Sequence, residues 1–73
     1  MMKNYVTFGQ GHVHSVNGKT FDKDCVAVYE TVDDEKAGRA MAFELFGDKF
    51  HRHLVKEPGD EFMSFFPRGF LHV

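Results

Sequence analysis

One dipeptide, Asn17-Gly18, limits the fold of this chain more than any other feature of its sequence. Asn-Gly is the strongest short signal for a two-residue hairpin turn of type I′, because both residues tolerate positive φ. Residues that favour extended backbone lie on both sides of it, in the segments Lys3–Phe8, His12–Val16, Lys19–Phe21 and Cys25–Thr31. The sequence therefore predicts antiparallel β-structure folded about this turn.

Both arms of the predicted hairpin are interrupted at about the same level. Gly9-Gln10-Gly11 breaks the first arm, and glycine inside a strand pattern often marks a bulge. A hairpin centred on the Asn-Gly turn places Val6 opposite Tyr29, and the interruption then faces the irregular residues 22–24 of the returning arm. We therefore expect one long hairpin, bent in the middle, rather than a structureless loop.

The strand and the helix that follow the hairpin have clear limits. Cys25–Thr31 is apolar on both faces as far as Tyr29, which is typical of a strand in the middle of a sheet. Asp33-Asp34-Glu35 predicts a helix start with Asp33 as the N-cap, and Gly47 is expected to end the helix in left-handed conformation. Helical spacing predicts that the stripe facing the sheet consists of Ala37, Ala40, Met41, Phe43 and Leu45.

Within the helix, Gly38 lowers helix propensity, but its small size would allow a close approach to the sheet.

The rest of the chain is expected to complete a small domain. After the helix we expect a strand at Asp48–Val55, a turn at Lys56–Gly59, a helical turn at Glu61–Phe66 capped by Asp60 and stopped by Pro67, and a terminal strand from Arg68.

A chain of 73 residues has room for one hydrophobic core, so residues 1–73 are expected to form a single domain. The predicted fold class is α+β. It consists of a bent hairpin, one helix packed on a largely antiparallel sheet of three or four strands, a short helix and a last strand. The strand order within the sheet stays open at this point.

The histidines raise the possibility of a metal site. His12-x-His14 and His51-x-His53 each place two imidazoles on the same side of a strand, a spacing that can provide two ligands of a tetrahedral zinc ion. Exposed polar residues on a solvated sheet face give the same pattern. No carboxylate is tied to either pair as an acid or base. If the protein binds a metal ion, these four histidines are the candidate ligands. The favoured interpretation is that they are exposed polar residues, so no metal or other cofactor is expected.

No catalytic group is expected either. Cys25 begins a strand with two apolar faces and should be buried, whereas a reactive cysteine needs an exposed, electropositive setting. A lone cysteine, an N-terminus without the features of a signal peptide and no apolar run of membrane-spanning length favour a cytoplasmic protein. Nine Lys and Arg against eleven Asp and Glu give a net charge of −2, and the basic residues are scattered. This balance argues against direct binding of nucleic acid.

Nine phenylalanines in so short a chain are unusual, and four of them lie between Phe62 and Phe70. They exceed what one short helical turn can bury on a single face, and aromatic rings beside arginine are typical of interface hot spots. We expect this segment and the outer sheet face to be the free surfaces, with Phe43 and Phe50 structural. The predicted partner-binding residues are Phe65, Phe66, Arg68 and Phe70, and a secondary set at the hairpin rim is Gln10, His12 and His14.

The stretches NYVTFGQGHVH with NGK, CVAVYE and AMAFELFGDKF resemble a group of short, mostly uncharacterised proteins of tailed bacteriophages. Those proteins begin with a Y-x-F-T-F-G-x-G-Q-x-H-like stretch and continue to a helix that ends in M-F-x-x-(F/Y)-G-x-K-W-like residues. The resemblance covers about positions 4 to 50. Phe50-His51-Arg52-His53 departs from the aromatic stretch that the group has there.

The resemblance implies a viral accessory protein that acts in the cytoplasm of a bacterial host, and it implies no enzymatic activity. The expected function is non-enzymatic: to bind a host protein and inhibit or redirect it, for example as an anti-CRISPR-like inhibitor of an antiviral defence complex. Two alternatives are a histidine-based metal-binding or small hydrolytic domain, and an oligomeric component of the virion or its assembly.

Overall fold

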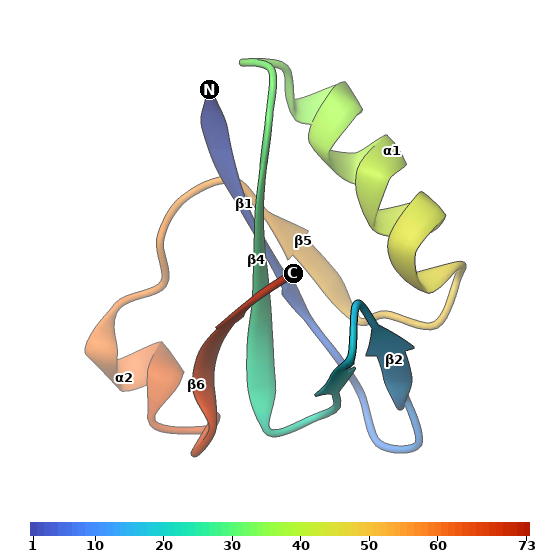
Figure 1. The fold of residues 1–73 in the computed structure, drawn as a ribbon. Helices are drawn as coiled ribbons and strands as arrows, with labels where there is room; N and C mark the ends of the chain where they lie inside the picture. Colours follow the sequence, from blue (N-terminus) through green and yellow to red (C-terminus); the bar gives the residue numbers. More distant parts are fainter.

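Four strands form the main sheet, and their order, β5-β1-β4-β6, places the two longest strands at its centre (Figure 1). In this computed structural model of residues 1–73 the strands are β1 (Met2–Thr7), β4 (Cys25–Thr31), β5 (Arg52–Leu54) and β6 (Gly69–His72). β1 is antiparallel to β4 and β5, whereas β6 is parallel to β4. The α+β class is confirmed, and β4 has a strand on each side, as its two apolar faces predicted.

The Asn17-Gly18 turn is where the sequence placed it. Asn17 has φ 51° and Gly18 has φ 78°, and they join β2 (His14–Val16) to β3 (Lys19–Phe21) in a separate two-stranded sheet. The predicted register holds in this part of the hairpin, where His14 lies opposite Phe21.

Nearer the main sheet the predicted register is wrong, because Val6 lies opposite Ala27 instead of Tyr29. The two arms have unequal irregular segments: 8–13 separates β1 from β2, whereas 22–24 separates β3 from β4. The longer segment displaces the pairing by two residues. Side chains alternate between the two faces of a sheet with a period of two residues. A displacement of two residues therefore leaves every side chain on the face predicted for it.

The conformation of this turn allows a direct test. We expect Gly18→Val to lower the free energy of unfolding by about 1 kcal/mol or more, because a β-branched residue is strained at positive φ. Nothing lies within 4 Å of the position that a Cβ atom would occupy, so the cost comes from the backbone alone. Gly18→Asn is the control, since asparagine tolerates this region. Urea denaturation measures both variants, and an unchanged midpoint for Gly18→Val would contradict the assigned turn.

Helix α1 (Glu35–Phe46) begins one residue later than predicted. Asp34, not Asp33, is the N-cap, and its Oδ1 accepts a hydrogen bond from the Lys36 N–H at 3.0 Å. Either aspartate satisfies the sequence preference at this position, so only the geometry of the chain entering the helix distinguishes them. Gly47 ends the helix as predicted, and its N–H donates to the Phe43 carbonyl at 2.8 Å. Its φ of 63° is positive, but its ψ of −140° lies outside the left-handed helical region, so the predicted left-handed conformation is wrong.

The buried line of α1 differs from the predicted stripe. Gly38, Ala42 and Phe46 are buried, Met41 and Leu45 are partly buried against the same core, and the expected Ala40 and Phe43 are exposed. The buried residues are spaced by four, and the first of them is a glycine, which a hydropathy pattern does not mark as apolar. The contact with the sheet therefore runs along a line rotated from the one that side-chain hydropathy indicates.

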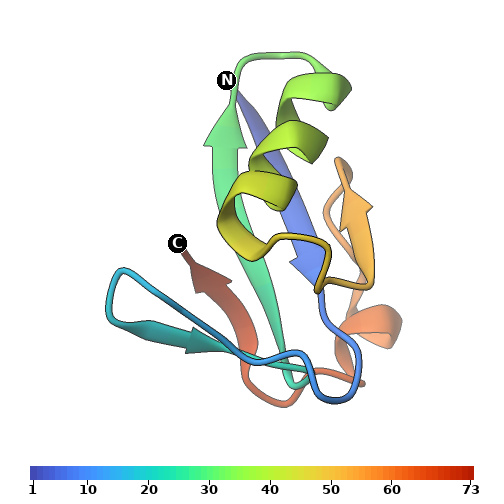
Figure 2. The ribbon, with the colours of Figure 1, turned by 90° about the vertical axis from the view of Figure 1, so that its right-hand side faces the viewer.

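Hydrophobic clusters lie on both faces of the main sheet, and α1 and α2 (Asp60–Met63) lie on opposite sides of it (Figures 1 and 2). Beneath α1 and the hairpin lies the larger cluster, formed by Val6, Phe8, Phe21, Cys25, Ala27, Tyr29, Ala42 and Phe46. On the other face Tyr5, Val26 and Val28 are buried, with Leu54, Met63 and Phe66 packed against them. The expectation of a free outer sheet face is wrong. β4 is apolar on both sides, so both sides must be covered.

Candidate partner-binding site

Local hydrogen bonds and a glycine turn fix the backbone of the C-terminal aromatic segment, Phe62–Phe70. The preceding helix α2 is one turn long, with Gly59 at the N-cap and Asp60 as its first residue, so the predicted capping role of Asp60 is wrong. Ser64 N–H donates to the Asp60 carbonyl at 3.0 Å, and Ser64 Oγ donates to the Glu61 carbonyl at 2.7 Å. Gly69 has φ 71°, which directs the chain from the turn into β6. The segment is thus a fixed turn rather than a free arm.

The aromatic rings of this segment divide between the interior and the surface. Phe66 packs with Met63 on the buried residues of the outer sheet face, and Phe62 stacks on Phe66 with ring centroids 5.3 Å apart. Phe65, by contrast, keeps 75% of its surface exposed. Of the neighbouring phenylalanines predicted to bind a partner, Phe66 therefore contributes to the fold of the free protein, and Phe65 is available for contact.

A shallow hollow beside Phe65 is lined by Gly59, Glu61, Phe62 and Phe65. Of these, Gly59, Glu61 and Phe62 were not among the residues predicted from the sequence to bind a partner. The spacing of Phe62 and Phe65 contained a signal, because residues three apart on a helical turn lie on the same side. Gly59 has no Cβ atom, and nothing lies within 4 Å of the place where one would be, so this side of the hollow is open.

Phe70 lies apart from this hollow, on β6. The residue is 40% exposed, and its ring centroid lies 5.8 Å from that of Tyr5. Burial raises the pKa of the Tyr5 hydroxyl, and the neighbouring Glu57 carboxylate raises it further. Phe70 thus combines a structural contact with an exposed edge, and it remains a candidate for partner binding.

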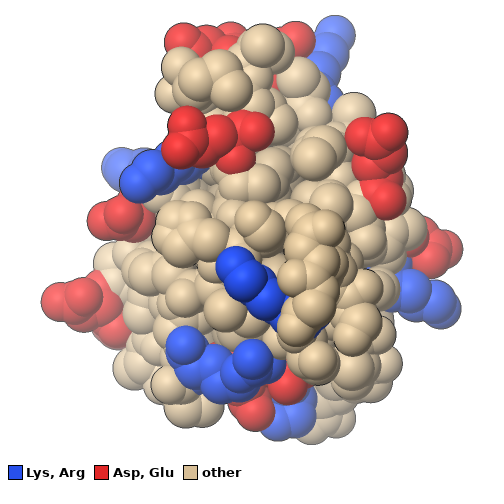
Figure 3. Space-filling model, viewed as in Figure 1, with Lys and Arg blue, Asp and Glu red and all other residues tan.

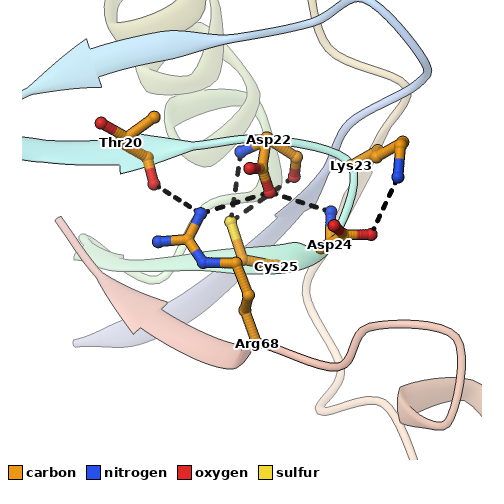
Figure 4. Close-up of polar contacts among 6 residues, drawn as sticks. All are labelled: Thr20, Asp22, Lys23, Asp24, Cys25 and Arg68. Carbon is orange, nitrogen blue, oxygen red and sulfur yellow. Dashed lines mark hydrogen bonds and ion pairs between the residues drawn. The ribbon is translucent and has the colours of Figure 1, made fainter.

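Arg68 already has partners within the chain (Figure 4). Its Nη1 donates to the Thr20 carbonyl at 2.9 Å and lies 3.2 Å from Asp22 Oδ1, and its backbone N–H donates to the Asp24 carbonyl at 2.8 Å. These contacts connect the start of β6 to the hairpin and to the turn before β4. Arg68 is therefore a structural residue in the free protein, and replacing it would test the fold as well as binding.

Cys25 is buried beside this ion pair, as the sequence predicted. The Asp22 N–H donates to Cys25 Sγ at 3.4 Å. Burial raises the pKa of the Cys25 thiol, and the hydrogen bond with the Asp22 backbone and the charge of Arg68 oppose that shift. The thiol is therefore mainly protonated near neutral pH, which is unfavourable for a nucleophile.

The histidine pairs have separate partners. His12 Nδ1 accepts from the Gly9 N–H at 2.9 Å, and His14 Nε2 donates to the Lys49 carbonyl at 2.7 Å. His53 faces the interior, whereas His51 is exposed. No group of three or more His, Cys, Asp or Glu side chains is arranged to hold a metal ion.

At the hairpin rim, two of the three secondary candidates are thus engaged within the chain, namely His12 and His14. The His14 ring also packs edge-on against Phe46, with centroids 5.3 Å apart. Gln10 is exposed, and so is its neighbour Val13, at 66%. The rim therefore offers one polar and one small apolar side chain, whereas Phe65 offers a large aromatic ring.

Charged side chains are dispersed over the surface (Figure 3). In this view acidic groups lie mostly around the periphery, whereas basic groups also lie near the centre and in the lower middle of the face. No helix is long and apolar enough to cross a membrane.

Comparison of the chain with protein-family models, with curated proteins and with solved structures found no match. The resemblance of residues 4–50 to phage proteins therefore stays a prediction.

Proposed function

We propose that this chain is a non-enzymatic accessory protein of a tailed bacteriophage that binds a protein of the bacterial host and inhibits or redirects it, for example within an antiviral defence complex. The phage setting and the host cytoplasm rest on the resemblance of residues 4–50. The binding activity rests on the surface of the C-terminal aromatic segment. One observation carries it: Phe65 is 75% exposed on a turn that buried residues hold in place.

An exposed ring on an ordered turn is well suited to anchor a partner, because less conformational entropy is lost on binding. Association loses the conformational freedom of the side chains that it orders, and a prearranged backbone reduces that loss. Phe65 projects from a turn whose Met63 and Phe66 side chains pack on the sheet, so the backbone beneath the ring is already ordered. Burial of a large aromatic ring in a partner would then contribute to affinity at a reduced entropic cost.

The proposal predicts a binding defect without a folding defect. We expect Phe65→Ala to weaken retention of the host partner at least about tenfold, as loss of a hot-spot ring does, and to leave the melting temperature unchanged. Affinity capture from infected host lysate, with mass spectrometry of the retained proteins, identifies the partner. Titration of that purified partner then gives the affinities.

Val13→Ala is the matched control, because Val13 is also exposed but lies at the hairpin rim. It should bind the partner as the unmodified chain does. Normal binding by Phe65→Ala, together with a defect in Val13→Ala or Gln10→Ala, would show that the rim and not the aromatic segment contacts the partner. Phe66→Ala and Arg68→Ala are unsuitable for this test, because both residues have contacts within the fold.

A further inference from the structure

The hollow beside Phe65 has a specific chemical composition. Two aromatic side chains, Phe62 and Phe65, line it together with the carboxylate-bearing Glu61. The face of an aromatic ring carries partial negative charge and attracts cations. Rings and carboxylate therefore favour the same kind of ligand group, one that is positively charged and has an apolar stem.

The surroundings of the hollow add negative charge. Residues 58–67 contain Asp60 and Glu61 but no lysine or arginine. Neither of these two carboxylates forms an ion pair. The ion pairs of the chain are Met1–Asp33, Lys23–Asp24 and Arg68–Asp22. Arg68, the next basic residue along the chain, has its charge opposed by Asp22. Lys56 precedes this segment in the sequence, but no basic side chain forms an ion pair with Asp60 or Glu61.

We propose that the hollow receives a lysine or arginine side chain of the partner protein, with arginine preferred. The inference rests on the proposed function and specifies the partner: an exposed segment in which a basic residue is flanked by apolar residues. A planar guanidinium stacks on aromatic faces and is weakly hydrated, so it loses less solvation than an ammonium group when it binds. The cation lies against Phe62 and Phe65 near Glu61, and the flanking apolar residues contact the exposed ring of Phe65.

Short peptides test the inference without knowledge of the partner. The probe is acetyl-Gly-Leu-Arg-Leu-Gly-amide, compared with the same peptide carrying citrulline or glutamate in place of arginine. Citrulline keeps the shape and removes the charge. In ¹⁵N NMR titrations of the full chain we expect the arginine peptide to shift the amide signals of Gly59, Phe62 and Phe65. The citrulline peptide should bind about threefold to tenfold more weakly, and the glutamate peptide should shift nothing.

Variants of the protein locate the effect. Glu61→Gln is expected to weaken the arginine peptide about threefold and to leave the citrulline peptide unchanged. Glu44→Gln is the matched control, because Glu44 is exposed on α1 and far in sequence from the hollow, and it should change neither affinity. Equal binding of the arginine and citrulline peptides, signal shifts confined to other residues, or no binding of the arginine peptide would each overturn the inference.

A second measurement separates this inference from the proposed function. If the captured host partner is lost with Phe65→Ala but retained equally by Glu61→Gln and the unmodified chain, the surface binds a partner without a cation, and only the inference fails. If Phe65→Ala retains the partner, the aromatic segment is not the binding surface, and the inference fails with it. Capture of no host protein by the unmodified chain would contradict the proposed function itself. Light scattering tests a second copy as the occupant: a dimer that Phe65→Ala converts to a monomer would also overturn the inference.

Discussion

Replacing Gly38 with alanine is expected to lower the free energy of unfolding by about 2–4 kcal/mol, although alanine is the better helix former. A Cβ atom at this position would lie 2.8 Å from Asn4 Cγ, closer still to Asn4 Oδ1, and 3.0 Å from His53 Nε2. Contacts this short require either the helix or the two polar side chains to move.

The Asn4 side chain has little room to move, because both of its ends are engaged. Its Nδ2 donates to Thr31 Oγ1 at 2.9 Å and to the Met2 carbonyl at 3.2 Å, and its Oδ1 accepts from His53 Nε2 at 2.8 Å. Asn4 is fully buried, and a displaced amide would leave polar groups without partners, at about 1–3 kcal/mol for each group. The Tyr29 hydroxyl further fixes the helix by donating to the Gly38 carbonyl at 2.6 Å.

The sign of the change distinguishes this account from simple helix propensity. Without the contact, Gly38→Ala would stabilise the helix by about 1 kcal/mol. Ala40→Gly is the matched control at an exposed position of α1, and it should cost about 1 kcal/mol through propensity alone. Urea denaturation measures the free energy of unfolding of Gly38→Ala, Ala40→Gly and the unmodified chain. A higher midpoint for Gly38→Ala than for the unmodified chain would show that the helix does not approach Asn4 as described.

The parts of the fold that the sequence predicted depend on local signals. Asn17-Gly18 determines its own turn through positive φ, Gly47 ends α1 for a similar reason, and Cys25–Thr31 is marked by apolar residues on both faces. None of these requires knowledge of a distant residue. The Asn4–His53 contact is different, because it joins residues 49 positions apart and becomes visible only once β1 and β5 are paired. Burial lowers the pKa of His53, with Glu35 acting in the opposite direction, and no local pattern indicates either effect.

The candidate site was predictable in its region but not in its individual residues. A surplus of phenylalanine between Phe62 and Phe70 indicated an aromatic surface. Phe65 and Phe66 are identical neighbours, yet one is exposed and the other packs on the sheet. Which of them faces outward depends on how the single turn of α2 is rotated over the sheet, and that rotation is set by tertiary contacts. The structural role of Arg68 likewise depends on Asp22, which is distant in the sequence.

The second large effect is expected at Phe21, where alanine should lower the free energy of unfolding by about 3–5 kcal/mol. Phe21 is fully buried, and its ring centroid lies 5.7 Å from that of Phe46 and 6.3 Å from that of Phe8. It is the last residue of β3, at the point where the small two-stranded sheet joins the main core. Removing the ring leaves a cavity among the other two rings and loosens the attachment of the hairpin.

A loss of this size is a large share of the stability available to a domain of 73 residues, which by its length is on the order of 4–11 kcal/mol. Urea denaturation followed by circular dichroism measures it. Phe21→Leu, which keeps most of the volume, should cost less and stay measurable if the alanine variant does not fold. Phe65→Ala is the matched control, since the same atoms are removed from an exposed ring, and it should change stability by less than about 0.5 kcal/mol. Equal midpoints for Phe21→Ala and Phe65→Ala would mean that the hairpin does not contribute its ring to the core.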